Sequence, residues 1–439
     1  MDDYRQRKEL FISNLNGTTL YETASVLINM CTTYFLCQIL KHSFVNNLFF
    51  NFLFENCIII IPLISICTLS SSISHIFHFV IWSIALFIYF LKKPSSINNS
   101  QTINKSYSRL IELTRGQILI VTCICILAVD FSIFPRRYAK TENYGYSIMD
   151  LGVGAFTITH GMVSSEARNK QTNFKELLVE NFVLFILGLI RLISVKYFSY
   201  IEHISEYGIH WNFFLTLCFM KLIGNCLLLI TKNLFALICL TLLFHEIILL
   251  RYLQFDNYLI EVNNLRIGFI DANREGIFSL GGYVCLYLIG IFFGRLIINY
   301  ERNQQFLQMT IKFSIAMIIL CGISYNTSRK LCNFGYISST TGLACLIIAS
   351  YSVILWLLIR KGYSTESTLL KYVNQKGFDM FLLANVLTGI INLNLNTIDT
   401  SNSVALCIII IYMFILSTYV YCFPSLIKLM IKTFKLSKT

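Results

Sequence analysis

Uninterrupted apolar stretches recur along the whole chain, and they constrain its fold more than any other feature of the sequence. A helix needs about 20 mostly apolar residues to cross a bilayer, and many of these stretches approach that length. They are continuous runs of Ile, Leu and Phe, whereas the strands of a membrane barrel alternate apolar and polar residues. The sequence therefore predicts an all-α fold, a polytopic integral membrane helical bundle.

About thirteen segments are predicted to span the membrane, within a single membrane-embedded domain over residues 1–439. They cover residues 21–40, 48–68, 73–91, 117–134, 150–165, 179–196, 213–230, 234–250, 280–299, 309–325, 341–359, 378–395 and 403–431. The composition agrees, because 56% of the residues are hydrophobic and 13% are charged, whereas about 25% of the residues of soluble domains are charged. The polar N-terminal segment has no apolar core followed by a cleavage site, so we expect the first span to be the membrane signal.

Neither the cysteines nor the net charge indicates a cofactor, a metal or a nucleic acid. Most of the 15 cysteines lie inside apolar runs, where a thiol behaves as a small apolar group, and no Cys-x-x-Cys pair occurs. The net charge of +12 is spread over many loops and forms no single basic patch. The sequence also lacks the Gly-x-Ser-x-Gly, phosphate-loop and His-Glu-x-x-His motifs. We therefore expect no cofactor, no metal and no nucleic acid, with membrane lipids as partners and no prediction of a protein partner.

The distribution of Lys and Arg predicts the orientation, because cytosolic loops carry an excess of these residues. The tail 432–439 contains three lysines, whereas the connector 399–403 before the last span contains no Lys or Arg. With thirteen spans, a cytosolic C-terminus places the basic loop 92–116 in the cytosol as well. The same alternation places the N-terminal segment 1–20 and the basic loop 135–149 on the opposite face.

Residues 130–154 form the segment best suited to chemistry. Asp130 lies about one helical turn inside the fourth apolar run, where an ionised side chain costs about 2.5–3.5 kcal/mol at the bilayer centre and less near the surface. Beyond a proline that ends the helix lie three cations, Arg136, Arg137 and Lys140. One hypothesis is a structural ion pair that holds the loop on the helix. The other is a general base, because shielding from water raises the pKa of a carboxylate and a nearby cation lowers it again.

Other polar residues of this segment each allow two interpretations. Two adjacent arginines fit a phosphate group bidentately, so Arg136 and Arg137 suit a phospholipid head group, but they equally suit ordinary anchoring at the interface. Tyr138 fits an aromatic belt as well as a binding site. Asp150 is placed to cap the next helix, an interpretation that we favour over catalysis.

Two histidines and one charged pair lie within or beside predicted spans, at His160, His245-Glu246 and Arg274-Glu275. Polar groups inside a membrane are often functional. Hydrogen bonding to a neighbouring helix explains the histidines as well, and a helix-entry cap explains the charged pair. The sequence leaves these alternatives open.

A long motif in the same part of the chain resembles a known family. It consists of Asp130-Phe131, Ile133-Phe134-Pro135-Arg136-Arg137-Tyr138-Ala139-Lys140-Thr141-Glu142, Tyr144-Gly145 and Met149-Asp150-Leu151-Gly152-Val153-Gly154. Similar stretches occur at residues 11–19, 210–214, 273–277, 383–389 and 394–397. Over the full length of the chain, these stretches resemble the glycosylphosphatidylinositol (GPI) inositol-acyltransferase family.

The resemblance implies an enzyme of the endoplasmic reticulum membrane with about thirteen spans. Such an enzyme transfers a fatty acyl group, typically palmitoyl, from acyl-coenzyme A to the inositol ring of glucosaminyl-phosphatidylinositol. Palmitoyl-CoA is then a donor substrate and not a cofactor. The family pattern implies that Asp130 and Lys140 form the catalytic pair on the lumenal face. Asp130 would act as the base towards an inositol hydroxyl, and Lys140 would orient it or stabilise the oxyanion.

Eight residues are candidates for binding the substrates. Arg136 and Arg137 are assigned to the inositol phosphate by their chemistry alone. The others lie in the family-like stretches, at Tyr138, Glu142, Asp150, Asn273, Arg274 and Asn385. Residues 328–333 are a looser version of an arginine-rich stretch of the family, and His160 stands where a smaller polar residue is expected.

Two other functions compete with this hypothesis. In a lipid or small-solute transporter, Asp130 and Lys140 would be a gating pair. Transporters often contain internal repeats, and we find no convincing similarity between the halves of this chain. In a histidine-dependent membrane-bound acyltransferase, His245 would be the base.

Overall fold

The computed structural model describes residues 2–13, 15–41, 47–92, 108–170, 174–197, 204–260 and 266–436, without the side chains of residues 2, 3, 5, 48, 174, 204, 205 and 423–436. Within these residues no strand is present, which agrees with an all-α fold. Two pieces of the segments used to predict the orientation, residues 93–107 and 437–439, lie outside the described residues.

Every predicted span overlaps a helix. The long helical segments are α2 (Leu20–Lys41), α3 (Leu48–Glu55) continued by η1 (Asn56–Ile60) and α4 (Ile61–Cys67), α5 (Ser74–Leu91), α6 (Arg109–Ala128), α7 (Ile148–Met162), α8 (Phe174–Tyr197), α10 (Phe213–Ile230), α11 (Leu234–Leu243) continued by η5 (Phe244–Tyr252), α15 (Leu280–Arg302), α16 (Phe306–Gly322), α17 (Phe334–Arg360), α19 (Gly377–Asn394) and α20 (Asn402–Leu436). Shorter helices connect them: α1 (Asp2–Ile12), η2 (Ser71–Ile73), η3 (Arg136–Tyr138), η4 (Glu166–Arg168), α9 (Ile204–Tyr207), α12 (Phe255–Ile260), α13 (Gly268–Ala272), α14 (Arg274–Phe278), α18 (Thr368–Gln375) and η6 (Thr397–Asp399).

Eleven helices in the described part of the chain are long and apolar enough to cross a membrane. This finding confirms the prediction of a polytopic helical membrane protein. The count of thirteen is not confirmed, because α7 has 15 residues and α16 has 17, and both are shorter than these eleven helices.

The fourth predicted span differs from the helix that the structure contains. We predict a span over residues 117–134, whereas α6 begins at Arg109 and ends at Ala128. The earlier start arises because Ser108 accepts a hydrogen bond from the Ile111 N–H, and because the charged residues of the first turns pair with neighbours. Hydropathy alone misses such paired polar residues, so the prediction assigned this part of the helix to a loop.

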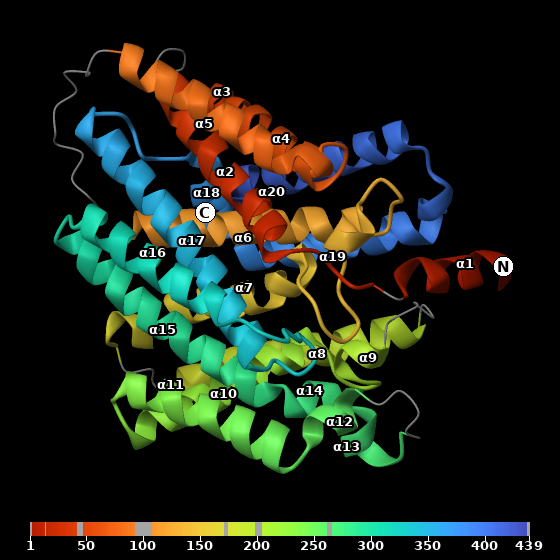
Figure 1. Cartoon of the computed structure of the whole chain (residues 1–439). Helices are drawn as coiled ribbons and strands as arrows, with labels where there is room; N and C mark the ends of the chain where they lie inside the picture. The colour runs from red at the N-terminus through yellow and green to blue at the C-terminus, as the bar shows by residue number, and fades with distance from the viewer. Residues whose placement is uncertain are drawn as a thin grey trace.

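The bundle has an inner set and an outer set of helices (Figure 1). Most residues of the inner helices α2, α6, α15 and α17 are buried, and α7 packs against α6, α15 and α17. By contrast, α5, α8, α11 with η5, and α19 expose large apolar side chains over most of their surface. An apolar outer surface is expected where helices face lipid.

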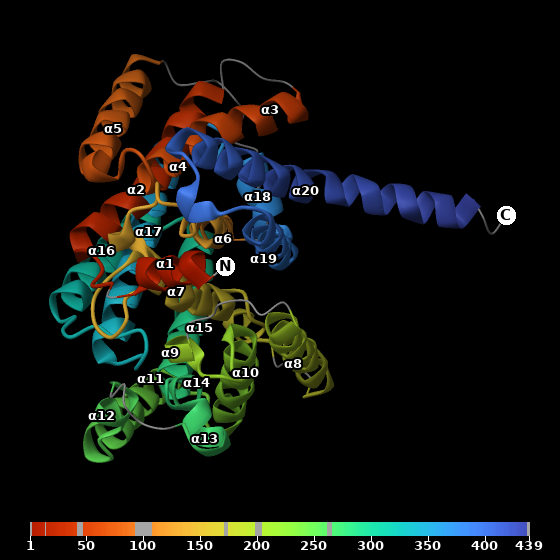
Figure 2. The same ribbon diagram turned by 90° about the vertical axis from the view of Figure 1, so that its right-hand side faces the viewer.

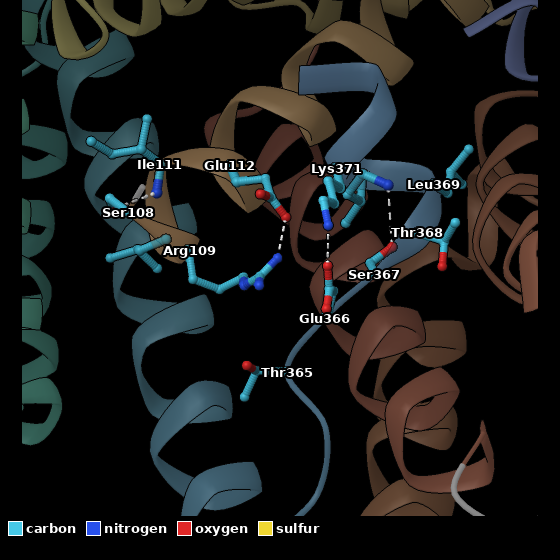
Figure 3. A network of polar contacts seen from close by, with 12 residues as sticks. Ser108, Arg109, Ile111, Glu112, Thr365, Glu366, Ser367, Thr368, Leu369 and Lys371 are labelled. Carbon is cyan, nitrogen blue, oxygen red and sulfur yellow. Dashed lines mark hydrogen bonds and ion pairs between the residues drawn. The ribbon is translucent and has the colours of Figure 1, made fainter. Parts of the chain in front are cut away.

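Charged connectors gather at the two ends of the bundle. One end is formed by α1, residues 129–147, α9 and residues 323–333; it lies on the right-hand side of Figure 1 and faces the viewer in Figure 2. We call it the site end. The opposite end carries a separate polar network around the first turns of α6 and α18, in which Arg109 pairs with Glu112 and Lys371 pairs with Glu366 (Figure 3).

Three distant segments are joined by backbone hydrogen bonds at the site end. The Thr18 N–H donates to the Tyr146 carbonyl, and the Gly145 N–H donates to the Thr327 carbonyl. Gly17 has a φ of 78°, and a Cβ there would lie 2.3 Å from the Tyr146 oxygen, so this close approach requires glycine. These contacts hold the 129–147 segment between the connector that precedes α2 and the 323–333 segment that precedes α17.

Candidate functional site

Asp130 lies in the turn that follows α6 and receives contacts from two other elements. Its carboxylate oxygen Oδ1 lies 3.8 Å from Lys8 Nζ of α1. Its other oxygen accepts a hydrogen bond of 2.8 Å from the Asn392 side-chain amide of α19. Lys8 also donates to the Asn392 side-chain oxygen at 3.3 Å, so the three side chains form one network.

The Asp130 carboxyl is shielded from water but remains accessible, with 13% of its side chain exposed. Burial raises the pKa of Asp130 above its ordinary value, and the neighbouring Lys8, Asn392, Arg136 and Lys140 lower it by less than burial raises it. A carboxylate in this environment binds a proton more strongly than an aspartate in water does. That property suits a general base.

Asp130 and Lys140 do not contact each other. Within the described residues, no ion pair joins the two side chains. Lys140 Nζ instead lies 2.6 Å from Glu206 Oε1 of α9, while its charge still acts on Asp130 from a longer distance. The direct ion pair, which was one of the two hypotheses for this segment, is absent between these two residues.

Lys140 is the first member of a chain of ion pairs, which we call the ion chain. Arg329 Nη1 lies 3.5 Å from the same Glu206 oxygen, and Arg329 Nε lies 2.8 Å from Asp150 Oδ1. The ion chain therefore runs from Lys140 through Glu206 and Arg329 to Asp150. It connects the 129–147 segment, α9, the 323–333 segment and the start of α7.

The ion chain stabilises the charged forms of its two central members, Glu206 and Arg329. Burial raises the pKa of Glu206, but Lys140 and Arg329 outweigh burial and hold that pKa at about 2. Burial lowers the pKa of Arg329, and the carboxylates of Glu206 and Asp150 more than reverse this effect. Glu206 and Arg329 are thus ionised at neutral pH, and the contact with Glu206 holds the Lys140 ammonium beside the segment that carries Asp130.

Asp150 completes the N-terminus of α7, although it is not the capping residue that we predicted. The cap is Ser147, whose hydroxyl oxygen accepts a hydrogen bond of 2.9 Å from the Asp150 N–H. Asp150 in turn accepts hydrogen bonds from the Ser147 hydroxyl and from the N–H and hydroxyl of Thr141. This arrangement is similar to a capping box, with the Ser147 hydroxyl in the place of the Ser147 N–H as donor to Asp150, and it accounts for a buried carboxylate at this position.

Arg136 is engaged by the end of α6. Its guanidinium donates to the carbonyl oxygens of Val129, Phe131 and Phe134 at 2.7–3.3 Å. The guanidinium carbon also lies 3.8 Å from the centre of the Phe11 ring. The Nη2 atom thus holds carbonyl oxygens at and just after the end of α6, which supports the structural interpretation. The buried Nη1 atom has no hydrogen-bond partner among the described residues.

The next two candidates converge on Glu22 of α2. Arg137 Nε lies 2.8 Å from Glu22 Oε1, and the Tyr138 hydroxyl donates to the same oxygen at 2.9 Å. Tyr138 is buried, so an aromatic belt does not describe it. Glu142 is exposed, and its N–H donates to the Leu15 carbonyl. Arg137 and Tyr138 thus hold the 129–147 segment against α2.

Asn273 and Arg274 form a buried junction between short helices. The Asn273 side-chain oxygen accepts a hydrogen bond of 2.7 Å from the His210 N–H, and its amide donates to the Phe269 carbonyl. Arg274 is 2% exposed and pairs with Asp271 at 3.2 Å and with Glu275 at 3.6 Å. Two of the family-like stretches, residues 210–214 and 273–277, therefore meet here.

Asn385 of α19 contacts Arg191, a cation that acts on the ion chain from a distance. Its side-chain oxygen accepts a hydrogen bond of 3.4 Å from Arg191 of α8, and the charge of Arg191 helps to lower the pKa of Glu206. Asn385 and Asn392 are seven residues apart on α19, so they lie on one face of that helix. This face of α19 thus borders both groups.

The two histidines have surroundings that explain their burial. The His245 Nε2 atom lies 3.1 Å from the carbonyl oxygens of Leu331 and Cys332, and thus holds the 323–333 segment. His160 packs near the Tyr287 ring, with a distance of 6.1 Å between ring centres. His245 has no exposed surface, which makes it poorly suited to act as the base of a histidine-dependent acyltransferase. No cluster of His, Cys, Asp or Glu within the described chain is arranged to hold a metal ion.

Four residues of the site were missed in the sequence: Lys8, Glu22, Glu206 and Asn392. Nothing in the sequence marks them, because each lies far along the chain from the residue that it contacts. Arg329 did have a signal, since it belongs to the stretch that resembles an arginine-rich part of the family.

The fold and the site define a polytopic helical membrane protein whose ordered charged groups surround a shielded carboxylate at one end of the bundle. A model of the GWT1 family matches residues 4–423. The chain is 32% identical to "GPI-anchored wall transfer protein 1" of Schizosaccharomyces pombe, over 94% of this chain and 96% of the relative. It is also 32% identical to the protein of the same name from Candida albicans, over 93% and 95%. The "Phosphatidylinositol-glycan biosynthesis class W protein" of Dictyostelium discoideum is 29% identical, over 94% and 96%.

The chain therefore belongs to the GWT1 family, the family of GPI inositol acyltransferases. This finding confirms the resemblance that the motif around Asp130 indicated.

Proposed function

We propose that this protein acylates the inositol ring of glucosaminyl-phosphatidylinositol, with palmitoyl-CoA as the acyl donor. A role in GPI-anchor biosynthesis follows from the family and from the names of its curated members. The observation that supports the chemistry is the environment of Asp130, a shielded carboxylate with a raised pKa that follows the C-terminal end of α6 at the site end.

In the proposed reaction, Asp130 acts as the general base. The carboxylate accepts the proton of one inositol hydroxyl while that oxygen forms a bond to the thioester carbonyl carbon. The carbon–sulfur bond then breaks and coenzyme A leaves as the thiol, with the proton supplied through Asp130. The thioester is already activated, so the protein needs no nucleophile of its own.

Lys140 is proposed to stabilise the oxyanion that forms on the thioester carbonyl. Its ammonium is held by Glu206, and Glu206 is held by Arg329, so the charge has a fixed position. A fixed positive charge needs no reorganisation when negative charge develops in the transition state. This arrangement supports a role for Lys140 at the oxyanion, since its ammonium contacts Glu206 and not Asp130.

We further propose that the protein lies in the endoplasmic reticulum membrane, with the site end in the lumen and the C-terminus in the cytosol. The distribution of Lys and Arg supports this orientation. The proposed chemistry requires no metal and no cofactor, because acyl-CoA supplies the activated group.

The test is acyl transfer in microsomes from cells that lack their own enzyme. Asp130→Asn keeps the size of the side chain and removes the base, so we expect labelling of glucosaminyl-phosphatidylinositol by radioactive palmitoyl-CoA to fall by about a hundredfold or more. Asp399→Asn is the matched control, because Asp399 also lies at the site end but is 44% exposed and pairs with Arg7.

Two results would count against the proposal. If Asp130→Asn retained full labelling, the aspartate would have no part in the reaction. If the unaltered protein gave no labelling while it was correctly inserted, the acyltransferase function itself would be excluded.

A further inference from the structure

The 323–333 segment is held by several hydrogen bonds and carries two adjacent cations, Arg329 and Lys330, at the site end. Cys332 has a φ of 48°, in the left-handed region, and its carbonyl is held by His245. The Asn333 side-chain oxygen accepts hydrogen bonds from the N–H groups of Ser328 and Tyr336. The backbone on either side of Arg329 and Lys330 is therefore held in place by hydrogen bonds.

The two cations differ in their partners. Arg329 pairs with Asp150 and Glu206, whereas Lys330 forms no hydrogen bond and no ion pair with any described residue. Lys330 is nevertheless 7% exposed. A largely buried lysine without a counter-ion is unfavourable, because its charge loses part of its hydration and gains no partner in return. A bound anion would supply the partner that Lys330 lacks among the described residues.

The neighbourhood of Lys330 cannot supply that anion. The charges that act on it are one carboxylate, Glu275, and three arginines, Arg274, Arg266 and Arg329. Glu275 already accepts two hydrogen bonds from Arg266, at 2.6 and 3.0 Å, and pairs with Arg274.

The other acids of this region are also occupied. Among the described residues, Asp271 pairs with Arg274, while Asp150 and Glu206 pair with Arg329. Burial lowers the pKa of Lys330, and the surrounding arginines lower it further. Lys330 is thus the surplus cation of the cluster.

We propose that Lys330 binds the phosphodiester of the acceptor lipid. A phosphodiester carries one negative charge, which matches one surplus ammonium, and lysine is a common phosphate ligand. This inference rests on the proposed function, and it names the residue that holds the acceptor beside the ion chain.

The position of Lys330 agrees with this role. It follows Arg329, whose partner Glu206 also holds Lys140. The phosphate and the reacting hydroxyl of the acceptor belong to one inositol ring, so their ligands have to lie in one region of the protein. By contrast, Arg136 and Arg137, which the sequence suggested for the phosphate, are engaged by the end of α6 and by Glu22.

Kinetics of three variants test the proposal. Lys330→Met removes the charge and retains most of the volume, Lys330→Arg retains the charge, and Arg251→Met removes a 65% exposed cation from the same end of the bundle. We expect Lys330→Met to raise the KM for glucosaminyl-phosphatidylinositol by about tenfold or more, because a hydrogen bond to a charged group is lost. The KM for palmitoyl-CoA should not change. Lys330→Arg and Arg251→Met should stay close to the unaltered protein.

The phosphates of coenzyme A are the alternative source of the anion. A rise in the KM for palmitoyl-CoA alone would assign Lys330 to the donor and overturn the proposal, and so would an unchanged KM for the acceptor. If the role of Lys330 were purely structural, Lys330→Met would be less stable than the unaltered protein. Since the substitution removes a buried unpaired charge, we expect the melting temperature of Lys330→Met in detergent to stay the same or to rise.

Binding without turnover separates this proposal from the proposed function. Phosphatidylinositol should raise the melting temperature of the unaltered protein in micelles, whereas diacylglycerol, which has no phosphate, should not. The effect should disappear in Lys330→Met. If phosphatidylinositol had no effect on the unaltered protein, the phosphate subsite would be rejected even if acyl transfer were observed. If binding persisted without acyl transfer, the proposed function would fail and the subsite would remain.

Discussion

The environment of Asp130 depends on a side chain from the first turns of the chain. Lys8 and Asn392 both favour the ionised carboxylate, through a charge at 3.8 Å and a hydrogen bond at 2.8 Å. Burial favours the protonated form and has the larger effect, so the pKa of Asp130 is raised. The proton affinity of the proposed base is therefore set by α1 and α19 as well as by α6.

Substitution of Lys8 should shift the pH dependence of acyl transfer. The proposed base works when it is deprotonated, so activity should fall as the pH drops through the pKa of Asp130. In Lys8→Met the ammonium no longer lowers the pKa of Asp130, so that pKa rises. The acidic half-point, which is the pH at which kcat/KM falls to half of its maximum on the acidic side, should therefore move upward by about one pH unit. The measurement is the pH profile of kcat/KM, with Arg7→Met as the control because Arg7 is exposed and pairs with Asp399. An unchanged or lower half-point in Lys8→Met would contradict the assignment of this limb to Asp130.

Some individual residues of the site could be predicted from the sequence, and others could not. Asp130 and Lys140 stand out because they are charged residues beside an apolar run and because they belong to a family motif. Glu206 and Asn392 carry no such mark. They reach the site through tertiary packing of α9 and α19, which the local pattern of residues does not encode.

At the level of the elements, the ion chain joins α9 to the 323–333 segment through the pair of Glu206 and Arg329. Glu206→Gln should destabilise the protein by about 3 kcal/mol, because it removes the carboxylate between Lys140 and Arg329 and leaves two cations close together. It should also lower kcat, since Lys140 would no longer be held in place. Thermal unfolding in detergent and the acyl-transfer assay measure the two effects. Glu366→Gln is the control, because it breaks an exposed ion pair at the opposite end of the bundle (Figure 3).

The stability that Glu206 contributes should depend on pH in one direction. Its pKa is about 2 in the folded protein, compared with an ordinary value of 4.5. A group whose pKa is lowered by folding stabilises the protein above its ordinary pKa, and this contribution is lost as the pH falls towards the folded value. The difference in melting temperature between the unaltered protein and Glu206→Gln should therefore be constant above about pH 5 and shrink below it. A difference that grew on acidification would contradict the ion chain.

The helices themselves could largely be predicted, since each predicted span overlaps a helix. Their ends could not. Hydropathy placed the start of the fourth span at residue 117, but paired and buried polar residues extend α6 back to Arg109. Similarly, Asp150 was expected to cap α7, whereas the smaller Ser147 takes that position and Asp150 supports it from inside the helix.

For the whole molecule, the predicted orientation has a direct test. An N-terminal extension that carries a glycosylation acceptor should receive a glycan, because residues 1–20 are expected on the lumenal face. The same extension at the C-terminus should remain unmodified, because the tail is expected in the cytosol. The measurement is a mass shift that an endoglycosidase reverses. A glycan on the C-terminal extension would invert the proposed orientation and move the site end to the cytosol.

The backbone contacts among Thr18, Tyr146 and Thr327 also have a consequence for biosynthesis. A ribosome releases the three segments at widely separated times, and Asn392, the amide partner of Asp130, emerges later still. The translocation machinery must therefore insert most of the helices before the carboxylate acquires its surroundings. A nascent chain that stalls ahead of α17 would have its first helices in the lipid and no assembled centre.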